Sequence, residues 1–234
     1  MSGELPSREL LQTQTDWLAS ARSRILRLAE IAGRTSVLDL GAGYGIITNE
    51  LRRRTSGLVI AVDHSLQALD SLQPCVCAEA SALPFRDKSF DLVFSQNVML
   101  WIRQCEQTIN SVQRILAPGG VWVLMEPDYG GIIEYPVELE TTAIWIAALT
   151  RAGADPQIGR KLPVLLGTAG FKVRTELLPR LEDPDPLRFE FLSELILSES
   201  EGMQLQRIKK QSGQLAPANQ ISHLPYFLII AERA

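Results

Sequence analysis

The clearest candidate binding segment is the glycine-rich turn Gly41-Ala42-Gly43-Tyr44-Gly45, which follows a short apolar run at residues 37–40. Residues 46–51 have the composition of a helix, so the order along the chain is strand, glycine turn, helix. Such a turn brings backbone N–H groups and the positive end of a helix dipole to a negative group of a ligand. The sequence therefore predicts a ligand-binding loop at residues 41–45.

The spacing of the glycines argues against a nicotinamide dinucleotide as the ligand. The dinucleotide pattern Gly-x-Gly-x-x-Gly needs its third glycine at position 46, where this chain has Ile46. Asp39, two residues before the turn, would also place a negative charge where a pyrophosphate does not need one. A nicotinamide-dependent oxidoreductase therefore remains only a disfavoured alternative.

A second candidate is Asp63, which closes the apolar run 58–62 and stands 22 residues after Gly41. In open α/β sheets a carboxylate at this place can accept hydrogen bonds from the hydroxyls of an adenosine ribose. Asp63 could instead cap a helix that begins at Ser65. The glycine turn upstream favours ribose binding.

Alternating apolar segments predict the elements that hold these residues. Strands are expected at residues 37–40, 58–62, 75–78, 90–94, 121–125, 171–178 and 226–230. Helices are expected at 11–32, 46–51, 65–72, 102–116, 139–150, 158–169 and 187–198, with a turn-rich segment at 182–186 and a polar stretch at 199–214. This alternation is typical of a doubly wound α/β fold with helices on both faces of the sheet. Without an internal repeat or a long linker, residues 1–234 are expected to form a single domain.

Composition and charge restrict the partners. The net charge is −4, so the chain has no overall basic field for nucleic acid, and Arg52-Arg53-Arg54 is expected to suit the end of a helix. No apolar run is long enough for a membrane span and the N-terminus lacks a signal pattern, which led us to expect a cytoplasmic protein. With three cysteines (Cys75, Cys77, Cys105) and two histidines (His64, His223), no metal site is predicted.

Taken in order, several motifs resemble those of the class I S-adenosylmethionine-dependent methyltransferases, in particular the group that includes ubiquinone/menaquinone-biosynthesis methyltransferases and their small-molecule relatives. The resemblance covers about residues 25–131 and rests on four motifs: Val37-Leu38-Asp39-Leu40 with the glycine turn; Val62-Asp63; Glu79-Ala80-Ser81-Ala82-Leu83-Pro84-Phe85 with Asp87-Lys88-Ser89-Phe90-Asp91-Leu92-Val93; and Arg114-Ile115-Leu116-Ala117-Pro118-Gly119-Gly120.

The resemblance implies a Rossmann-like sheet of about seven strands, mostly parallel, with an antiparallel last strand. It also implies S-adenosyl-L-methionine as cofactor and S-adenosyl-L-homocysteine as product. Residues 1–34 would form a helical cap, 35–131 the cofactor-binding core, and 132–234 the substrate side. By position, the implied cofactor contacts are Asp39, Gly41, Ala42, Gly43, Asp63, His64, Glu79, Ala80, Ser95 and Gln96. Glu79 departs from the aspartate that the family usually has after its third strand, which puts the adenine contact in doubt.

The acceptor of the methyl group is predicted to be a small molecule that is apolar or aromatic. Residues Trp17, Met99, Leu100, Trp101, Tyr129 and Trp145 fall on elements expected near the crevice, although core packing would explain any one of them. His64, Tyr129 and Glu126 are weak candidates for a general base. The stretch Glu126-Pro127-Asp128-Tyr129-Gly130-Gly131 is either a substrate contact or a simple turn.

Of three further alternatives, the motifs leave one open and disfavour two. A binding or regulatory protein could keep the cofactor site without turnover, and intact motifs do not exclude it. A nucleic-acid amino-methyltransferase is disfavoured because Ser95-Gln96-Asn97-Val98 lacks the Pro-Pro motif of that class. The metal-dependent catechol type is disfavoured because no acidic cluster lies nearby. The oligomeric state does not follow from the sequence.

Overall fold

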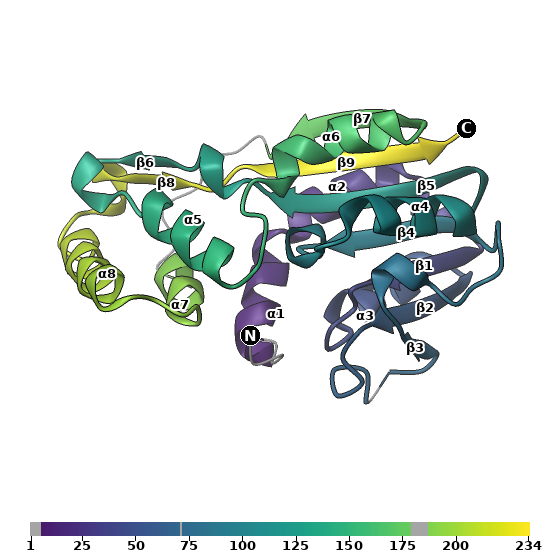
Figure 1. Cartoon of the computed structure of the whole chain (residues 1–234), viewed down its shortest axis with the longest axis horizontal. Coiled ribbons are helices and arrows are strands. Elements are labelled where there is room, and N and C mark those ends of the chain that lie inside the picture. Colours follow the sequence, from purple (N-terminus) through teal and green to yellow (C-terminus); the bar gives the residue numbers. More distant parts are fainter. Residues whose placement is uncertain (1–5, 71, 179–186) are drawn as a thin grey trace.

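The computed structural model describes residues 6–70, 72–178 and 187–234. A seven-stranded sheet in the order β3-β2-β1-β4-β5-β9-β7 lies at its centre (Figure 1). Only β9 runs antiparallel to its neighbours β5 and β7, so the predicted mostly parallel sheet with an antiparallel last strand is confirmed. The strands are β1 Ser36–Leu40, β2 Leu58–Asp63, β3 Cys75–Cys77, β4 Phe90–Gln96, β5 Leu116–Pro127, β7 Phe171–Leu177 and β9 Tyr226–Arg233.

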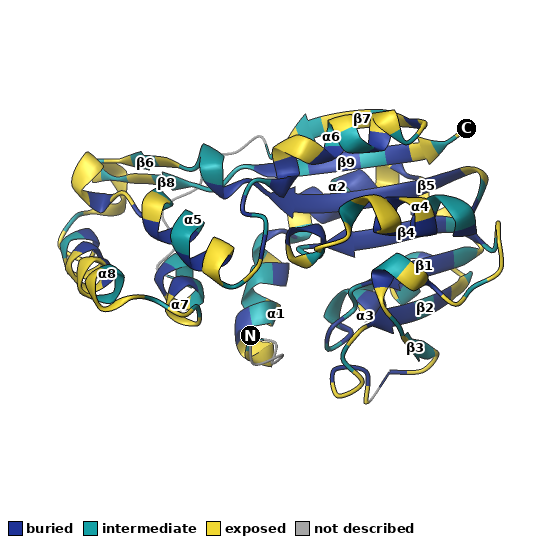
Figure 2. Ribbon diagram, viewed as in Figure 1, coloured by how far each residue is buried: buried dark blue, intermediate teal, exposed yellow. Residues whose placement is uncertain are grey.

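Helices cover both faces of this sheet, as expected for strands that are apolar on both sides. On one face α1, α2 and α3 pack on a cluster that contains Val37, Phe94 and Val123. On the other face α4 and α6 pack on a cluster around Leu38 and Trp122. The central strands are accordingly buried along most of their length (Figure 2). The helices are α1 Arg8–Trp17, α2 Ala19–Leu28, α3 Ile46–Arg54, α4 Cys105–Ile115, α5 Thr142–Arg151 and α6 Ile158–Thr168.

A smaller lobe lies beside the carboxyl ends of the parallel strands (Figure 1). It contains a two-stranded antiparallel sheet of β6 Ile133–Tyr135 and β8 Ile221–His223, together with α5, α7 Leu187–Ser193 and α8 Glu199–Ser212. The sequence did not predict this sheet, because three-residue strands carry too little alternation to be recognised.

The expected N-terminal helix at residues 11–32 is divided into α1 and α2. Leu18 joins the two helices and is fully buried. The change of direction places the Trp17 ring edge-on to the Tyr226 ring, with 5.4 Å between the ring centroids. Tertiary packing therefore divides a segment whose apolar spacing alone predicts one continuous helix.

The expected helix at residues 65–72 is wrong. Described residues in this segment form turns whose hydrogen bonds span three residues, such as Leu72 N to Leu69 O at 2.9 Å. The carboxylate of Asp63 accepts a hydrogen bond from Ser65 N at 2.9 Å, which offers the backbone an alternative to a helix.

The C-terminal half contains two further corrections. The polar stretch at 199–214 is largely the helix α8, which starts with a capping box formed by Ser198 and Glu201. The helix expected at 187–198 ends at Ser193. The predicted turn-rich segment 182–186 lies outside the described residues. Across the described ranges, no helix is long and apolar enough to cross a membrane.

Candidate functional site

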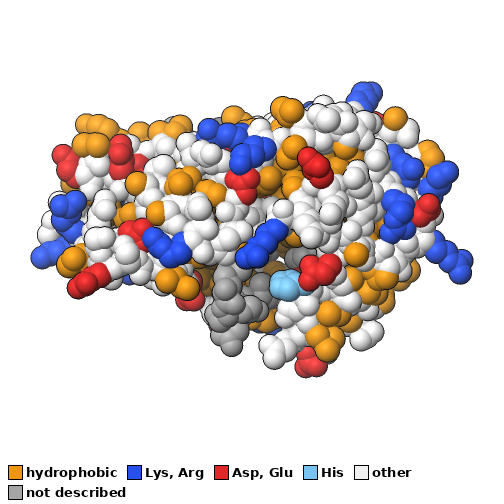
Figure 3. Space-filling view, viewed as in Figure 1, with side chains coloured by type: hydrophobic (Ala, Val, Ile, Leu, Met, Phe, Trp, Pro, Cys, Tyr) orange, Lys and Arg blue, Asp and Glu red, His pale blue; other side chains and the backbone are white. Residues whose placement is uncertain are grey.

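The strand order places a topological switch point between β1 and β4, because the chain winds outward from these two strands in opposite directions. In such sheets, ligands bind beyond the carboxyl ends of the strands at the switch point. Here those ends carry the glycine turn after β1, Asp63 at the end of β2, and Gln96 at the end of β4 with the residues 97–99 that follow it. Figure 3 shows the molecular surface hollowed between the main sheet and the smaller lobe.

The glycine turn is held in a left-handed conformation. Gly41, Gly43 and Gly45 have φ angles of 75°, 50° and 72°, which L side chains rarely adopt. A Cβ atom at Gly41 would lie 2.3 Å from Cγ2 of Val98. The loops after β1 and β4 therefore pack directly against each other at the switch point.

Asp63 is bonded to the glycine turn. Its Oδ2 accepts a hydrogen bond from Gly43 N at 2.8 Å, and its Oδ1 accepts from Ser65 N at 2.9 Å and lies 3.2 Å from Nδ1 of His64. A carboxylate has about four acceptor sites, so this one keeps capacity for the hydroxyls of a ribose. The residues present therefore fit an adenosine-containing cofactor at this place.

Asp39 is buried behind the turn. Its Oδ2 accepts a hydrogen bond from Thr48 Oγ1 at 2.5 Å, which ties β1 to the first turn of α3. Burial raises its pKa to about 7, and the charge of Asp63 raises the pKa as well. Asp39 therefore stabilises the glycine turn from its buried side, in addition to any contact with a ligand.

The other predicted cofactor residues lie around the same edge. Glu79 is exposed at the start of the short helical turn Ala80–Ala82, next to β3. Ser95 is fully buried and accepts a hydrogen bond from Trp122 Nε1 at 3.0 Å, on the face covered by α4. The Ser95 hydroxyl is therefore engaged inside the protein.

Gln96, the last residue of β4, is held by a residue that the sequence analysis missed. Arg22 of α2 donates from Nη1 to Gln96 Oε1 at 3.2 Å and to the Thr15 carbonyl at 2.9 Å, and from Nε to Glu50 Oε2 at 2.8 Å. Arg22 is only 1% exposed. The available signal was its place within the apolar stripe of the first helical segment, between Leu18 and Ile25.

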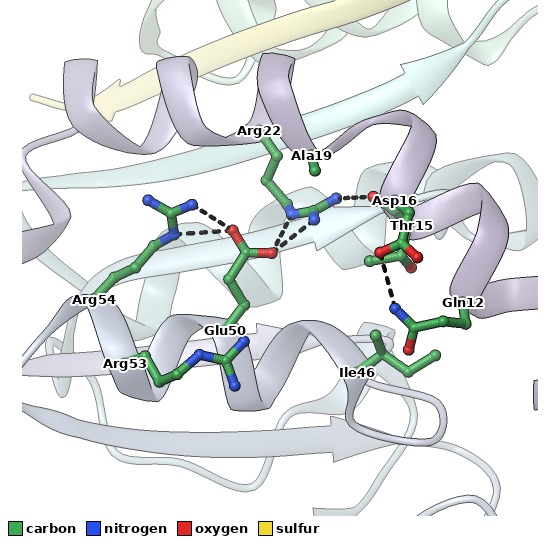
Figure 4. Close-up of a pocket in the computed structure, with 9 residues that line it drawn as sticks. All are labelled: Gln12, Thr15, Asp16, Ala19, Arg22, Ile46, Glu50, Arg53 and Arg54. Atoms are coloured by element: carbon green, nitrogen blue, oxygen red, sulfur yellow. Dashed lines mark hydrogen bonds and ion pairs between the residues drawn. The ribbon is translucent and has the colours of Figure 1, made fainter.

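A cavity of about 390 Å³ lies beside this arginine, between the N-terminal helices and α3 (Figure 4). Glu50 in its wall pairs with Arg22 and Arg54 at the same time. The lining residues are Gln12, Thr15, Asp16, Ala19, Arg22, Ile46, Glu50, Arg53 and Arg54.

Glu126 lies near the carboxyl end of β5 and is fully buried. Its Oε1 accepts hydrogen bonds from Val98 N at 2.9 Å and Met99 N at 3.0 Å, whereas Oε2 has no partner among the described residues. Burial raises the pKa of Glu126 to about 7. Burial and the nearby Glu126 charge also raise the pKa of Tyr129, so its hydroxyl stays protonated near neutral pH.

The expected aromatic pocket is divided into separate groups. The centroids of the Tyr129 and Trp145 rings lie 4.7 Å apart with their planes tilted by 34°, whereas Trp17 packs on Tyr226 at the other face of the sheet. Met99 and Leu100 are buried, and Trp101 is 37% exposed.

Asp128, the alternative contact in the stretch after β5, has structural partners. Its Oδ2 accepts from Arg160 Nε at 2.6 Å, and its Oδ1 accepts from Gly130 N at 3.2 Å. This carboxylate caps the turn that carries Tyr129, as the turn interpretation predicts.

The buried Glu126 carboxyl predicts a pH dependence of stability. Its folded-state pKa of about 7 lies above the ordinary glutamate value of 4.5, so as pH rises the folded chain keeps this proton to a higher pH than the unfolded chain does. Stability should therefore fall as pH rises from about 4.5 to about 7, by about 3 kcal/mol for this group. In Glu126→Gln, the difference in unfolding free energy between pH 5 and pH 8, measured with urea, should shrink by that amount. The control is the exposed Glu79→Gln; an unchanged pH slope in Glu126→Gln would contradict the assignment.

The strand order, the glycine turn and the acid that ends β2 define the class of protein: an α/β protein with the Rossmann-like fold of methyltransferases. The family model described as "Methyltransferase domain" matches residues 38–124. Over residues 38–124 the chain therefore matches the class I S-adenosylmethionine-dependent methyltransferase family, and S-adenosylmethionine is the cofactor of that family.

The relatives carry names of different reactions. Malonyl-[acyl-carrier protein] O-methyltransferase of Halorhodospira halophila is 42% identical over 94 residues, covering 36% of this chain and 32% of the relative. The mitochondrial arginine-hydroxylase NDUFAF5 of Mus musculus is 29% identical over 214 residues, covering 80% of this chain and 61% of the relative. The match thus spans less than two thirds of the length of either relative.

Solved structures share the fold. Geranyl diphosphate C-methyltransferase from Streptomyces coelicolor, in a complex that includes S-adenosyl-L-homocysteine, has a TM-score of 0.56 and 14% identity, covering 91% of this chain and 77% of that one. At this identity, the likeness concerns the fold alone.

Proposed function

We propose that this chain transfers a methyl group from S-adenosylmethionine to a small-molecule acceptor. The observation that carries the proposal is the 2.8 Å hydrogen bond between Gly43 N and Asp63 Oδ2, which joins the glycine turn and the acid after β2 at one edge of the sheet. One cofactor can then contact both places, with its ribose at Asp63 and its amino-acid half at the glycine turn and the end of β4.

The chemistry makes modest demands on the protein. A sulfonium is an excellent leaving group, so the main task is to hold nucleophile, methyl carbon and sulfur in line, and positioning can contribute about 7–11 kcal/mol. A proton acceptor is optional. Of the three predicted candidates, Glu126 is best suited because its pKa of about 7 matches neutral conditions, whereas Tyr129 stays protonated and His64 is exposed beside Asp63.

The acceptor is proposed to be apolar or aromatic. The neighbouring Tyr129 and Trp145 rings, with buried Met99 and Leu100, belong to one apolar cluster on the α4 side of the sheet. In this proposal, residues 35–131 bind the cofactor and also supply Met99, Leu100 and Tyr129 to the acceptor side, and residues 132–234 supply Trp145 and the rest of it.

The proposal is tested by replacing Asp63. In Asp63→Ala, affinity for S-adenosylhomocysteine, measured by calorimetry, should fall at least tenfold, or about 1.4 kcal/mol, because charge-assisted hydrogen bonds to the ribose are lost. Asp87→Ala is the matched control, since Asp87 is exposed before β4, at the opposite edge of the sheet. Equal affinity in the Asp63 variant and the unmodified chain would refute the site.

Methyl transfer itself needs its own measurement, because one relative is named for a hydroxylation and a non-catalytic binding protein is the alternative. Incubation with S-adenosylmethionine labelled in its methyl group and a panel of aromatic amines, phenols and carboxylic acids should give a labelled acceptor and S-adenosylhomocysteine in equal amounts. Tight cofactor binding with no labelled product across the panel would favour the binding protein.

A further inference from the structure

We infer that Arg22 is a positioning residue for the cofactor site: it fixes the Gln96 side chain so that the amide nitrogen, not the oxygen, faces the carboxylate of the cofactor's methionyl group. This inference rests on the proposed function and adds a residue from the N-terminal helices to it.

The hydrogen-bond partner of Gln96 determines which way its side-chain amide is oriented. A guanidinium has five donors and no acceptor, so the amide atom that faces Arg22 must be the oxygen. The Nε2 atom is then directed to the other side of the planar amide. Within the described residues no hydrogen bond is made by this nitrogen, and it is not among the fully buried unpartnered atoms. Gln96 is 9% exposed, so this nitrogen can donate to a ligand that contacts the exposed part of the side chain.

Arg22 itself cannot rotate easily, because three elements hold it. Its donors bind the Thr15 carbonyl of α1, the Glu50 carboxylate of α3 and Gln96 of β4, and the side chain is almost fully buried. Turning the Gln96 amide over would place its NH2 group against a guanidinium that can only donate. That arrangement would leave a buried polar contact unsatisfied, which is unfavourable.

The donor character of this nitrogen decides which group of the ligand it can bind. The methionyl group offers an ammonium, which only donates, and a carboxylate, which only accepts, so the N–H donor of Gln96 binds the carboxylate. Net charge does not decide the choice, because the three arginines that line the adjoining cavity face two carboxylates there, and Asp39 and Asp63 lie at the glycine turn (Figure 4). Gln96 is near the glycine turn, because Val98, two residues later, packs on Gly41.

The test compares two ligands that share their nucleoside half. S-adenosylhomocysteine carries the amino-acid group, and 5′-methylthioadenosine lacks it. Gln96→Glu keeps an oxygen acceptor for Arg22 but presents a second acceptor in place of the N–H donor. Calorimetry should show that S-adenosylhomocysteine binds this variant at least tenfold more weakly, while 5′-methylthioadenosine affinity changes less than threefold.

The remaining outcomes distinguish a failure of this inference from a failure of the proposed function. If Gln96→Glu weakens both ligands equally, or neither, the inference is wrong while the proposed function stands. If the unmodified chain binds neither ligand, the proposed function fails and the inference fails with it. Asp63→Ala, which removes a ribose contact, should weaken both ligands and so provides the contrasting pattern.

The role of Arg22 is tested by the ratio of the two affinities, which loss of structure alone would not change. In Arg22→Met the amide is free to turn, so the preference for S-adenosylhomocysteine over 5′-methylthioadenosine should fall at least fivefold. In Arg22→Lys an ammonium can still donate to Gln96, and the preference should change less than twofold. Equal ratios in Arg22→Met and the unmodified chain would overturn the positioning role.

Discussion

Replacing Arg22 with methionine is expected to lower the free energy of unfolding by about 3 kcal/mol, the lower end of the range for breaking a buried ion pair. The substitution leaves the Thr15 carbonyl and the Gln96 oxygen without their donor. Glu50 keeps Arg54 as a partner, which places the loss at the lower end. Urea unfolding followed by circular dichroism measures the difference.

The control for this variant is Arg53→Met. Arg53 lines the same cavity but is exposed, and a surface substitution of this kind should change stability by about 0.5 kcal/mol or less. A loss in Arg22→Met as small as that in Arg53→Met would show that the buried arginine does not hold the N-terminal helices to the sheet.

Replacing Gly41 with alanine is expected to cost about 2–5 kcal/mol of stability and to weaken S-adenosylhomocysteine binding at least tenfold. An L residue at a φ of 75° is strained by about 1–2 kcal/mol. The new Cβ would also lie 2.3 Å from Val98 Cγ2, and overpacking of this kind costs about 1–3 kcal/mol. Either the Val98 side chain or the glycine turn must shift to relieve the contact, and a shift of the turn would displace the cofactor contacts.

A double variant separates these two causes. Gly41→Ala combined with Val98→Ala removes the collision and leaves the backbone strain, so it should recover part of the lost stability. Gly33→Ala is the neutral control, because a Cβ there meets nothing within 4 Å. If Gly41→Ala unfolds at the same urea concentration as Gly33→Ala, the close packing of the two loops is refuted.

The sequence predicts the sheet well because each strand is a short apolar run between turn residues. All seven runs became strands, and the antiparallel last strand is where the family resemblance implies it. The predicted helix at 65–72 is wrong for a physical reason. The Asp63 carboxylate accepts a hydrogen bond from the Ser65 N–H, and helix propensities do not account for this local contact. The capping box of Ser198 and Glu201 is a sequence signal for the start of α8, although the polar composition of residues 199–214 does not predict a helix.

For the site, the sequence predicts the residues that lie close together along the chain or belong to the motifs shared with the family. Gly43 and Asp63 do meet, through a hydrogen bond. The partners of Gln96 and Ser95 were out of reach, because Arg22 and Trp122 are 74 and 27 residues away. Long-range partners of this kind depend on three-dimensional packing, which no local pattern encodes. Whether the ten predicted cofactor residues contact the ligand stays a prediction.

The smaller lobe has a consequence for how such a molecule can diversify. Its two short strands follow β5 and precede β9, and those two long strands pair without interruption from Val121 with Glu232 to Pro127 with Tyr226. Insertions or exchanges in the lobe would therefore occur beyond the end of an intact ladder, leaving the nucleoside-facing edge undisturbed. If the smaller lobe contacts the acceptor as proposed, related proteins could change their acceptor by changes in this lobe while the main sheet stays the same.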